Sequence, residues 1–193
     1  MTPPNPDYPA RLEIDRPQRL SRLLIFVKWL LLFPHYIVLY VLGIVAYFVL
    51  VIAFFAVLIL GRYPRALFDY MTGFERWRSR VASYYLLQID AYPPFTLQDD
   101  PSYPVRLEVE YPERIARWRP LVQWLLVIPA AIVAAVLSLV ALLATVLAWF
   151  AILFTGNYPE SLFDTVTIAL RWSARTTLYL YWVVDRYPPF VWA

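Results

Sequence analysis

Two long apolar blocks alternate with stretches in which aromatic and charged residues are mixed. The first block covers residues 23–60 and the second covers residues 121–155. The polar residues that interrupt them are Lys28 and His35 in the first block and Gln123, Ser138 and Thr145 in the second. Because about 20 apolar residues cross the hydrocarbon core of a bilayer, both blocks are expected to lie in lipid. The pattern predicts an integral membrane protein.

The length of the first block leaves two geometries open. A single helix over residues 23–60 would be about 57 Å long, nearly twice the hydrocarbon thickness. Two crossings joined by a tight turn fit into the block and its flanks, so a helical hairpin is predicted for each block. Pro34 and Pro129 would kink the first arm, and Gly43 and Ser138 would lie near the turns. The alternative is one long kinked helix per block, which gives an inverted pair.

The arginines that flank the blocks favour the hairpin. With one crossing per block, both sides of the membrane would carry many arginines. With a hairpin per block, every flanking arginine falls on one side, as the positive-inside rule prefers. This predicts a multi-pass protein with both termini in the cytoplasm. Lys28, the single lysine, is expected to extend to the lipid headgroups.

The chain is an internal duplication. Residues 8–95 recur at 103–190 with a constant offset of 95, and roughly 40 of the 88 aligned positions are identical. The duplication divides the chain into an N-terminal tail, two membrane repeats, a linker and a C-terminal end. Their boundaries are 1–7 for the tail, 8–95 for the first repeat, 96–102 for the linker, 103–190 for the second repeat and 191–193 for the end.

Each repeat opens with a short extended segment. Residues 8–14 and 103–109 alternate apolar and charged side chains between prolines, which predicts a half-buried strand. Because a lone strand is unstable, the two segments are expected to pair with each other or to lie along another part of the chain. The predicted fold class is therefore all-α integral membrane, with two repeats that each contain an extended segment, a kinked hairpin and an amphipathic helix.

The amphipathic helix follows each apolar block. Gly61 and Gly156 end the membrane helix, and Pro64 and Pro159 open the next one. With 3.6 residues per turn, a polar and aromatic stripe forms along each of these helices. We call these sets the arginine stripes: Asp69, Arg76, Trp77, Arg80 and Tyr84 in the first repeat, and Asp164, Arg171, Trp172, Arg175 and Tyr179 in the second.

The arginine stripes are the candidate functional residues. The structural interpretation is that an aspartate near the helix start favours the helix dipole and pairs with arginine along the helix. The binding interpretation is a helix in the headgroup plane that binds anionic lipid, or that docks a partner protein. Trp77 and Trp172 would add cation–π contacts in both cases.

Several motifs together resemble one known family. Gly-Arg-Tyr-Pro-Arg-Ala-Leu-Phe-Asp at 61–69, Arg76-Trp77, Arg80-Val81 and Asp-Ala-Tyr-Pro-Pro-Phe at 90–95 resemble the bacterial membrane family called domain of unknown function 4389. The second repeat carries the same closure, but Ile168 and Thr176 stand where the first has Gly73 and Val81. The resemblance covers nearly all of both halves. It implies a protein of the bacterial cytoplasmic membrane, and it carries no activity, cofactor or catalytic residue.

Composition and motifs favour a non-enzymatic function without cofactor or metal. The chain is 61% hydrophobic and 16% charged, has no cysteine and only four glycines. It contains no metal-binding His/Glu helix, phosphate loop or nucleophile elbow. His35 is the single histidine and is interpreted as a packing or interfacial residue. The arginines lie next to the apolar blocks, which does not favour nucleic-acid binding.

The function expected from these features is an accessory or structural subunit of a bacterial membrane protein complex. Its expected partners are anionic membrane lipids and other membrane proteins or a second copy of itself. The alternative is a small transporter or channel component, because duplicated membrane units often build transport paths. A path normally needs polar groups near the midplane, and Ser138 and Thr145 have no polar counterparts in the first repeat. This favours the accessory function.

Overall fold

Both repeats form the same elements in the same order, a strand followed by a short, a long and a further helix. The computed structural model describes residues 8–190, so the tail at 1–7 and the end at 191–193 lie outside the described residues. The elements are β1 (Ala10–Ile14), α1 (Leu24–Leu31), α2 (Phe33–Leu60), α3 (Arg65–Tyr85), β2 (Val105–Val109), α4 (Arg119–Leu126), α5 (Ile128–Thr155) and α6 (Glu160–Leu180). The mostly helical fold with two tandem units is confirmed.

The predicted hairpins are wrong, because each apolar block forms one long helix. α2 continues through Gly43 and α5 through Ser138 without a turn. One glycine or serine costs a helix only about 1 kcal/mol or less, which does not outweigh the backbone hydrogen bonds of a continuous helix. The alternative geometry, one kinked helix per block, is the observed one.

The kinks lie where the prolines predict them. Leu32 separates α1 from α2, and Val127 separates α4 from α5. Pro34 and Pro129 occupy the first turn of the long helices that follow. Proline fits there because the backbone N–H groups of a first turn have no partner within the helix. Gly61 and Gly156 end the long helices in the left-handed conformation, with φ of 67° and 75°.

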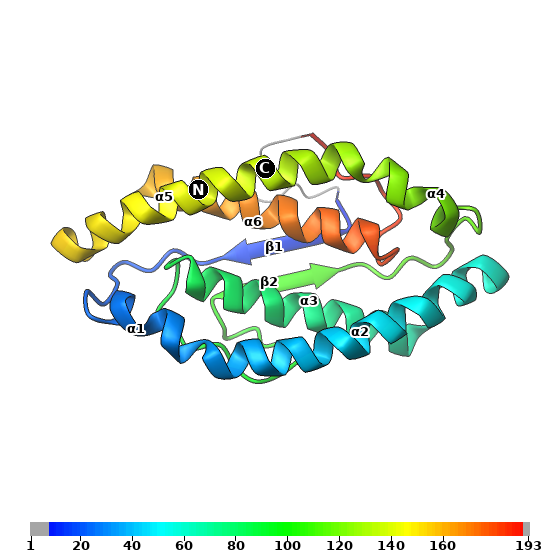
Figure 1. The fold of residues 1–193 in the computed structure, drawn as a ribbon, viewed down its shortest axis with the longest axis horizontal. Coiled ribbons are helices and arrows are strands. Elements are labelled where there is room, and N and C mark those ends of the chain that lie inside the picture. Colours follow the sequence, from blue (N-terminus) through cyan, green and yellow to red (C-terminus); the bar gives the residue numbers. More distant parts are fainter. Residues whose placement is uncertain (1–7, 191–193) are drawn as a thin grey trace.

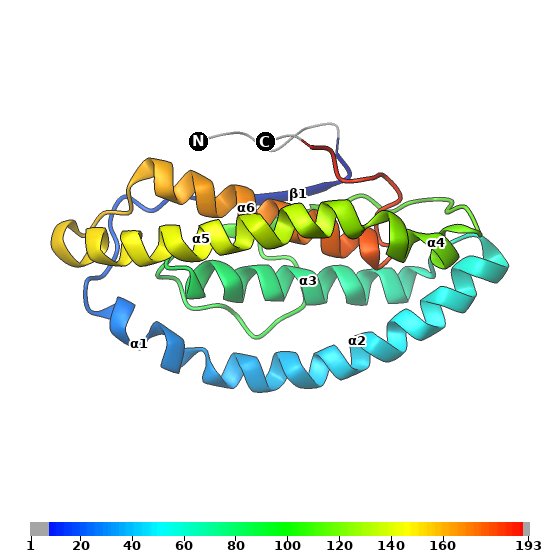
Figure 2. The same ribbon diagram turned by 45° about the horizontal axis from the view of Figure 1, so that its top comes forward.

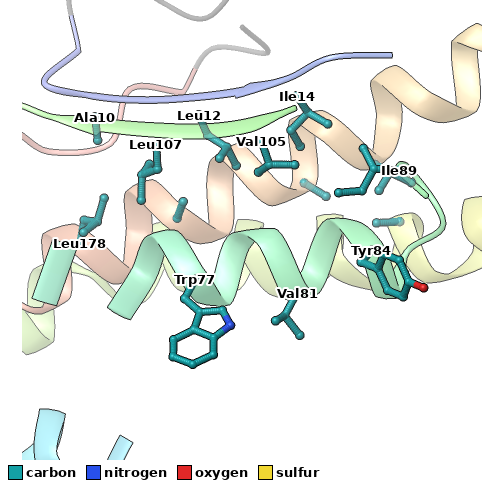
Figure 3. Packing of buried hydrophobic residues seen from close by; sticks show 14 of the residues in the cluster. Ala10, Leu12, Ile14, Trp77, Val81, Tyr84, Ile89, Val105, Leu107 and Leu178 are labelled. Carbon is teal, nitrogen blue, oxygen red and sulfur yellow. The ribbon is translucent and has the colours of Figure 1, made fainter. Parts of the chain in front are cut away.

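The two strands pair with each other, as the sequence predicts. β1 and β2 are antiparallel, with Leu12 opposite Leu107. Their apolar side chains are buried on the helix side, and Figure 3 shows Leu12, Val105 and Leu107 pointing from the strands toward α3. The side chains on the opposite face are charged. They are Arg11, Glu13, Arg106 and Glu108.

The helices lie along the long axis of the molecule on either side of the strands (Figure 1). α3 and α6 pack against the strands and against each other, while α2 packs along α3 and α5 along α6. Figure 1 shows α2 and α5 as the two outer helices, and in Figure 2 α3 runs between them. In Figure 3, Trp77 and Val81 point away from the strands, toward the side of α3 on which α2 lies.

Each strand packs on the amphipathic helix of the other repeat. α3 of the first repeat contacts β2 of the second, and α6 of the second contacts β1 of the first. The loops also bind the other repeat: Leu20 N donates to Gly156 O, and Ile115 N donates to Gly61 O, both at 2.9 Å. The two repeats therefore share one core and are held together by contacts that occur twice.

The outer surfaces of α2 and α5 are apolar. Within residues 8–190, the segments Leu24–Leu60 and Ile128–Thr155 are long and apolar enough to cross a membrane. Only 22% and 28% of their most apolar windows are buried inside the protein. The core helix of a soluble protein would be mostly buried, so most of this apolar surface is not covered by residues 8–190.

Candidate functional site

The arginines of the two stripes face the strands and the linker and are largely inside the protein. The side chains of Arg80 and Arg175 are 0% and 2% exposed, and those of Tyr84 and Tyr179 are buried as well. The exchanged strands cover the side of α3 and α6 that carries these arginines, so it does not face the headgroups. Trp77, in contrast, points away from the strands (Figure 3). Binding of lipid or a partner by these residues stays a prediction.

Arg76 and Arg171 bind the outer edges of the exchanged strands. Arg76 Nε donates to Leu107 O at 3.2 Å, and Arg171 Nε donates to Leu12 O at 3.0 Å. In an antiparallel pair of strands, hydrogen-bonded pairs of residues alternate with pairs that are not hydrogen-bonded. Asp15 N donates to Pro104 O, so in this register Leu12 and Leu107 form a pair that is not hydrogen-bonded, and their carbonyls point away from the partner strand. A buried carbonyl needs a donor, and each arginine supplies one from the other repeat.

Arg80 and Arg175 lie over tyrosine rings. Each guanidinium carbon lies 5.3 Å from the ring centroid, Arg80 over Tyr103 and Arg175 over Tyr8. Burial lowers the pKa of both arginines below its usual range, and in Arg80 the neighbouring Arg76 adds to this. The cation–π contacts compensate part of the lost hydration. The sequence analysis missed Tyr8 and Tyr103 as partners, although their recurrence at the repeat offset was a usable signal.

Asp69 pairs with an arginine of its own helix, but this arginine lies outside the stripe. Asp69 forms an exposed ion pair with Arg65, four residues earlier, at 3.2 Å. Arg76 instead lies 3.4 Å from Asp99, and its Nη1 donates to Leu97 O at 3.0 Å. The linker thus contributes an acid to the first stripe. Asp164 lies near enough to Arg171 to raise the pKa of that guanidinium, which burial lowers more strongly.

The tryptophans of the stripes bind aromatic neighbours. Trp77 Nε1 donates to His35 Nδ1 at 3.0 Å, and His35 stacks on Phe95 with ring centroids 4.0 Å apart. In the second repeat, the ring centroids of Trp172 and Phe190 lie 5.5 Å apart, and Phe190 is the counterpart of Phe95. The interpretation of His35 as a packing residue agrees with this arrangement, in which it is fully buried.

The placement expected for Lys28 is wrong. Its side chain is 1% exposed and does not extend outward. Nζ donates to Ile89 O at 2.6 Å and lies 2.8 Å from Asp90 Oδ1. A lysine one turn inside an apolar block reaches the headgroups only where no closer partner exists, and here the end of the repeat supplies both a carbonyl and a carboxylate.

A second polar centre lies between α3 and α6, on residues that the sequence analysis did not select. Glu75 is 2% exposed, and its Oε1 accepts a hydrogen bond from Arg78 Nη2 at 2.8 Å. The same nitrogen donates to Thr177 Oγ1 of α6 at 2.9 Å. Glu75 Oε2 is buried and has no hydrogen-bond partner within residues 8–190. Burial raises the pKa of the Glu75 carboxyl, and the Arg78 charge opposes that rise.

Hollows adjoin this pair on the side of α3 that faces away from the strands. A cavity of about 220 Å³ between α3 and α6 has Glu75, Arg78 and Ser173 in its wall. A second of about 500 Å³ lies between α2 and α3 and shares Arg78 and Ala82 with the first. A third of about 410 Å³ shares Tyr85 with the second and extends to α1 and α5.

The repeated strand and helix unit, the exchanged contacts and the two long apolar helices define a class of duplicated helical proteins with apolar outer helices. Comparison with family models identifies the particular family. Residues 22–96 and 117–191 match the family described as Domain of unknown function (DUF4389), and the chain belongs to this family. No curated protein and no solved structure matches the chain significantly. The resemblance in two tandem copies is thereby confirmed.

Proposed function

We propose that the protein is a non-enzymatic membrane component with a structural or accessory role. α2 and α5 lie in lipid, and the arginine stripes hold the two repeats together as one unit. The observation that carries this proposal is the continuous exposed apolar surface on both long helices. Its side chains include Phe33, Ile37, Tyr40, Val41, Tyr47, Phe48 and Phe55 on α2 and Ile132, Val136, Leu139, Leu143, Leu147 and Phe154 on α5.

This surface is much larger than the apolar patches of soluble monomers. Such patches rarely exceed a few hundred Å², and here two 28-residue helices expose theirs along their whole length. Each large apolar side chain that leaves water contributes roughly 1.5–3 kcal/mol. Immersion of α2 and α5 in a bilayer is therefore strongly favourable.

The charged face of the strands favours an orientation in the membrane plane. Arg11, Glu13, Arg106 and Glu108 lie on the strands, about halfway along the long axis in Figure 1. If the long axis followed the membrane normal, these charges would fall near the bilayer midplane, where each costs about 2.5–3.5 kcal/mol or more. We propose that the strand face is in water and that α2 and α5 lie in one leaflet.

Single cysteines test this orientation, because the natural chain has none. Gln18→Cys and Arg62→Cys place exposed thiols near the two ends of the first long helical segment, and Glu108→Cys places one on the strand face. We expect all three to react with a membrane-impermeant maleimide from the same side of sealed vesicles. If Gln18→Cys and Arg62→Cys react from opposite sides, the helix crosses the membrane and the in-plane orientation is wrong.

The polar residues of the apolar helices support the accessory function over the transport alternative. Ser138 Oγ donates to Ala134 O at 2.7 Å, and Thr145 Oγ1 donates to Ala141 O at 2.8 Å. Both hydroxyls are thus bound to their own helix, a common arrangement for serine and threonine in membrane helices. A transport path would need such groups to face the solute.

Purification from the native membrane and reconstitution test the accessory role together. In a gentle detergent we expect the protein to elute at a fixed stoichiometry with another membrane protein or with itself. Proteoliposomes that contain the purified protein should be no more permeable to ions and small solutes than protein-free liposomes prepared in parallel. A monomer that conducts a solute in these vesicles would contradict the proposal and support the transport alternative.

A further inference from the structure

The hollows on the side of α3 away from the strands differ sharply in polarity. Arg78, Ala82 and Tyr85 lie on this side, opposite Arg76 and Arg80, because residues about 3.6 apart share a helix face. The cavity between α3 and α6 contains the Glu75–Arg78 pair and serine hydroxyls. The cavity between α2 and α3 is mainly aromatic and aliphatic. A ligand that fills both must have a polar head and an apolar chain.

The wall of the polar cavity contains an acid and a base side by side. Glu75 belongs to this wall, and its Oε2 is buried without a hydrogen-bond partner in the described part of the chain. The Arg78 side chain is 40% exposed, and Nη2 is the nitrogen that holds Glu75 and Thr177. Its other guanidinium nitrogens make no hydrogen bond within residues 8–190 and are available to an anion. A buried acceptor without a partner costs about 1–3 kcal/mol, more if charged, so a ligand that donates to it gains affinity.

The apolar cavity fits an acyl chain. Its wall includes Leu39 of α2 and Phe74 and Val81 of α3, and its volume of about 500 Å³ lies within the usual range of ligand sites, roughly 300–1,000 Å³. Arg78 and Ala82 belong to the walls of both cavities, so the head and the chain of one molecule meet at these residues.

We propose that this groove binds a phospholipid with a phosphoethanolamine headgroup. The phosphate lies on the free nitrogens of Arg78, the ammonium donates to Glu75 Oε2, and one acyl chain follows the apolar cavity between α2 and α3. The groove would obtain this ligand from the bilayer, so the inference rests on the proposed placement of this face toward lipid.

The charges decide between headgroups. The Glu75–Arg78 pair is neutral overall and has one charge of each sign. It therefore matches a zwitterion, whose negative group can bind Arg78 while its positive group binds Glu75. Phosphatidylcholine carries no N–H or O–H donor for Glu75. Phosphatidylglycerol has hydroxyl donors, but its uncompensated negative charge would lie beside a buried carboxylate, which is unfavourable where the local dielectric is low.

Native mass spectrometry of the purified protein in detergent measures the binding directly. The probes are phosphatidylethanolamine, phosphatidylglycerol and phosphatidylcholine with identical acyl chains. We expect phosphatidylethanolamine to be retained most strongly, and Glu75→Gln and Arg78→Gln each to weaken its binding by at least about tenfold. Equal retention of phosphatidylcholine, or stronger retention of phosphatidylglycerol, would overturn the headgroup assignment.

Two further variants separate binding from folding. Ala82→Trp fills the wall shared by both cavities and leaves the Glu75–Arg78 pair in place, so it should remove the bound lipid even if Glu75→Gln does not fold. Arg65→Gln breaks the exposed Arg65–Asp69 pair of the same helix and should leave lipid binding unchanged. The groove is the wrong site if Ala82→Trp retains the lipid or if Arg65→Gln loses it. Because binding is measured in detergent, its result is independent of the orientation in the membrane.

Discussion

Replacing both Arg76 and Arg171 by methionine is expected to lower the free energy of unfolding by about 3–6 kcal/mol. Each guanidinium donates to the outer carbonyl of an exchanged strand, Leu107 for Arg76 and Leu12 for Arg171. A hydrogen bond to a charged group contributes about 1.5–3 kcal/mol, and methionine keeps the packing volume while removing the donor. Chemical unfolding in detergent, followed by tryptophan fluorescence, measures the effect.

The exposed Arg62 provides the matched control, because Arg62→Met removes a guanidinium outside the core. This variant should unfold within about 0.5 kcal/mol of the natural protein. The single variants at Arg76 and Arg171 should each lose about half of the double effect, since the two sites are separate and each variant removes the donor to one strand carbonyl. If the double variant has the same free energy of unfolding as the natural protein, the strands are held by their apolar side chains alone.

Gly73→Ala is expected to destabilise the protein, although alanine normally stabilises a helix interior by about 1 kcal/mol relative to glycine. A Cβ at Gly73 would lie 2.7 Å from Leu97 O and 2.8 Å from Leu97 Cβ of the linker. The linker carbonyl cannot move freely because it accepts a hydrogen bond from Arg76. Overpacking costs about 1–3 kcal/mol, and Gly73→Ile, which also displaces this bond, should lose about 3–5 kcal/mol.

Gly43→Ala is the control, because there alanine should stabilise the helix in the ordinary way. A Cβ at Gly43 would meet only the edge of the Phe74 ring, at an ordinary 3.8 Å. Thermal unfolding in detergent should therefore show a gain for Gly43→Ala and a loss for Gly73→Ala. A gain at both positions would show that the linker does not press on α3 in solution.

The sequence predicted those features that depend on local pattern and on the repeat. Alternating side chains in residues 8–14 identified the strands, and the duplication explained why each strand has a partner. Glycine and proline at 61–64 marked the end of α2 and the start of α3. These features follow from backbone geometry within a few residues, so a single sequence contains enough information to find them.

The hairpin was predicted wrongly because the length of each apolar block was matched to the bilayer thickness. The bilayer thickness limits the length only of a helix that follows the membrane normal. A helix in the membrane plane has no such limit, and Gly43 alone is too weak a turn signal to divide it. The proposed orientation in the membrane plane rests on the charged strand face, whose position along the long axis appears only once the chain is folded.

The helical period found the arginine stripes but not what covers them. A helical wheel assigns Arg80 and Arg175 to one face, and only the tertiary fold places Tyr103 and Tyr8 over them. Glu75 and Arg78 were missed for a different reason. Their counterparts in the second repeat, Leu170 and Ser173, carry no charge. A comparison that looks for residues kept in both repeats therefore does not find the Glu75–Arg78 pair.

The exchange of strands also sets the order in which the chain can assemble. Arg171 and the carbonyl of Leu12 are separated by 159 positions, and the Tyr8 hydroxyl bonds to Arg186 O across 178. During synthesis from the N-terminus, β1 is made well before the helix that covers it. The first repeat cannot complete its core until the second has been made, because contacts between distant segments form only after the intervening chain exists.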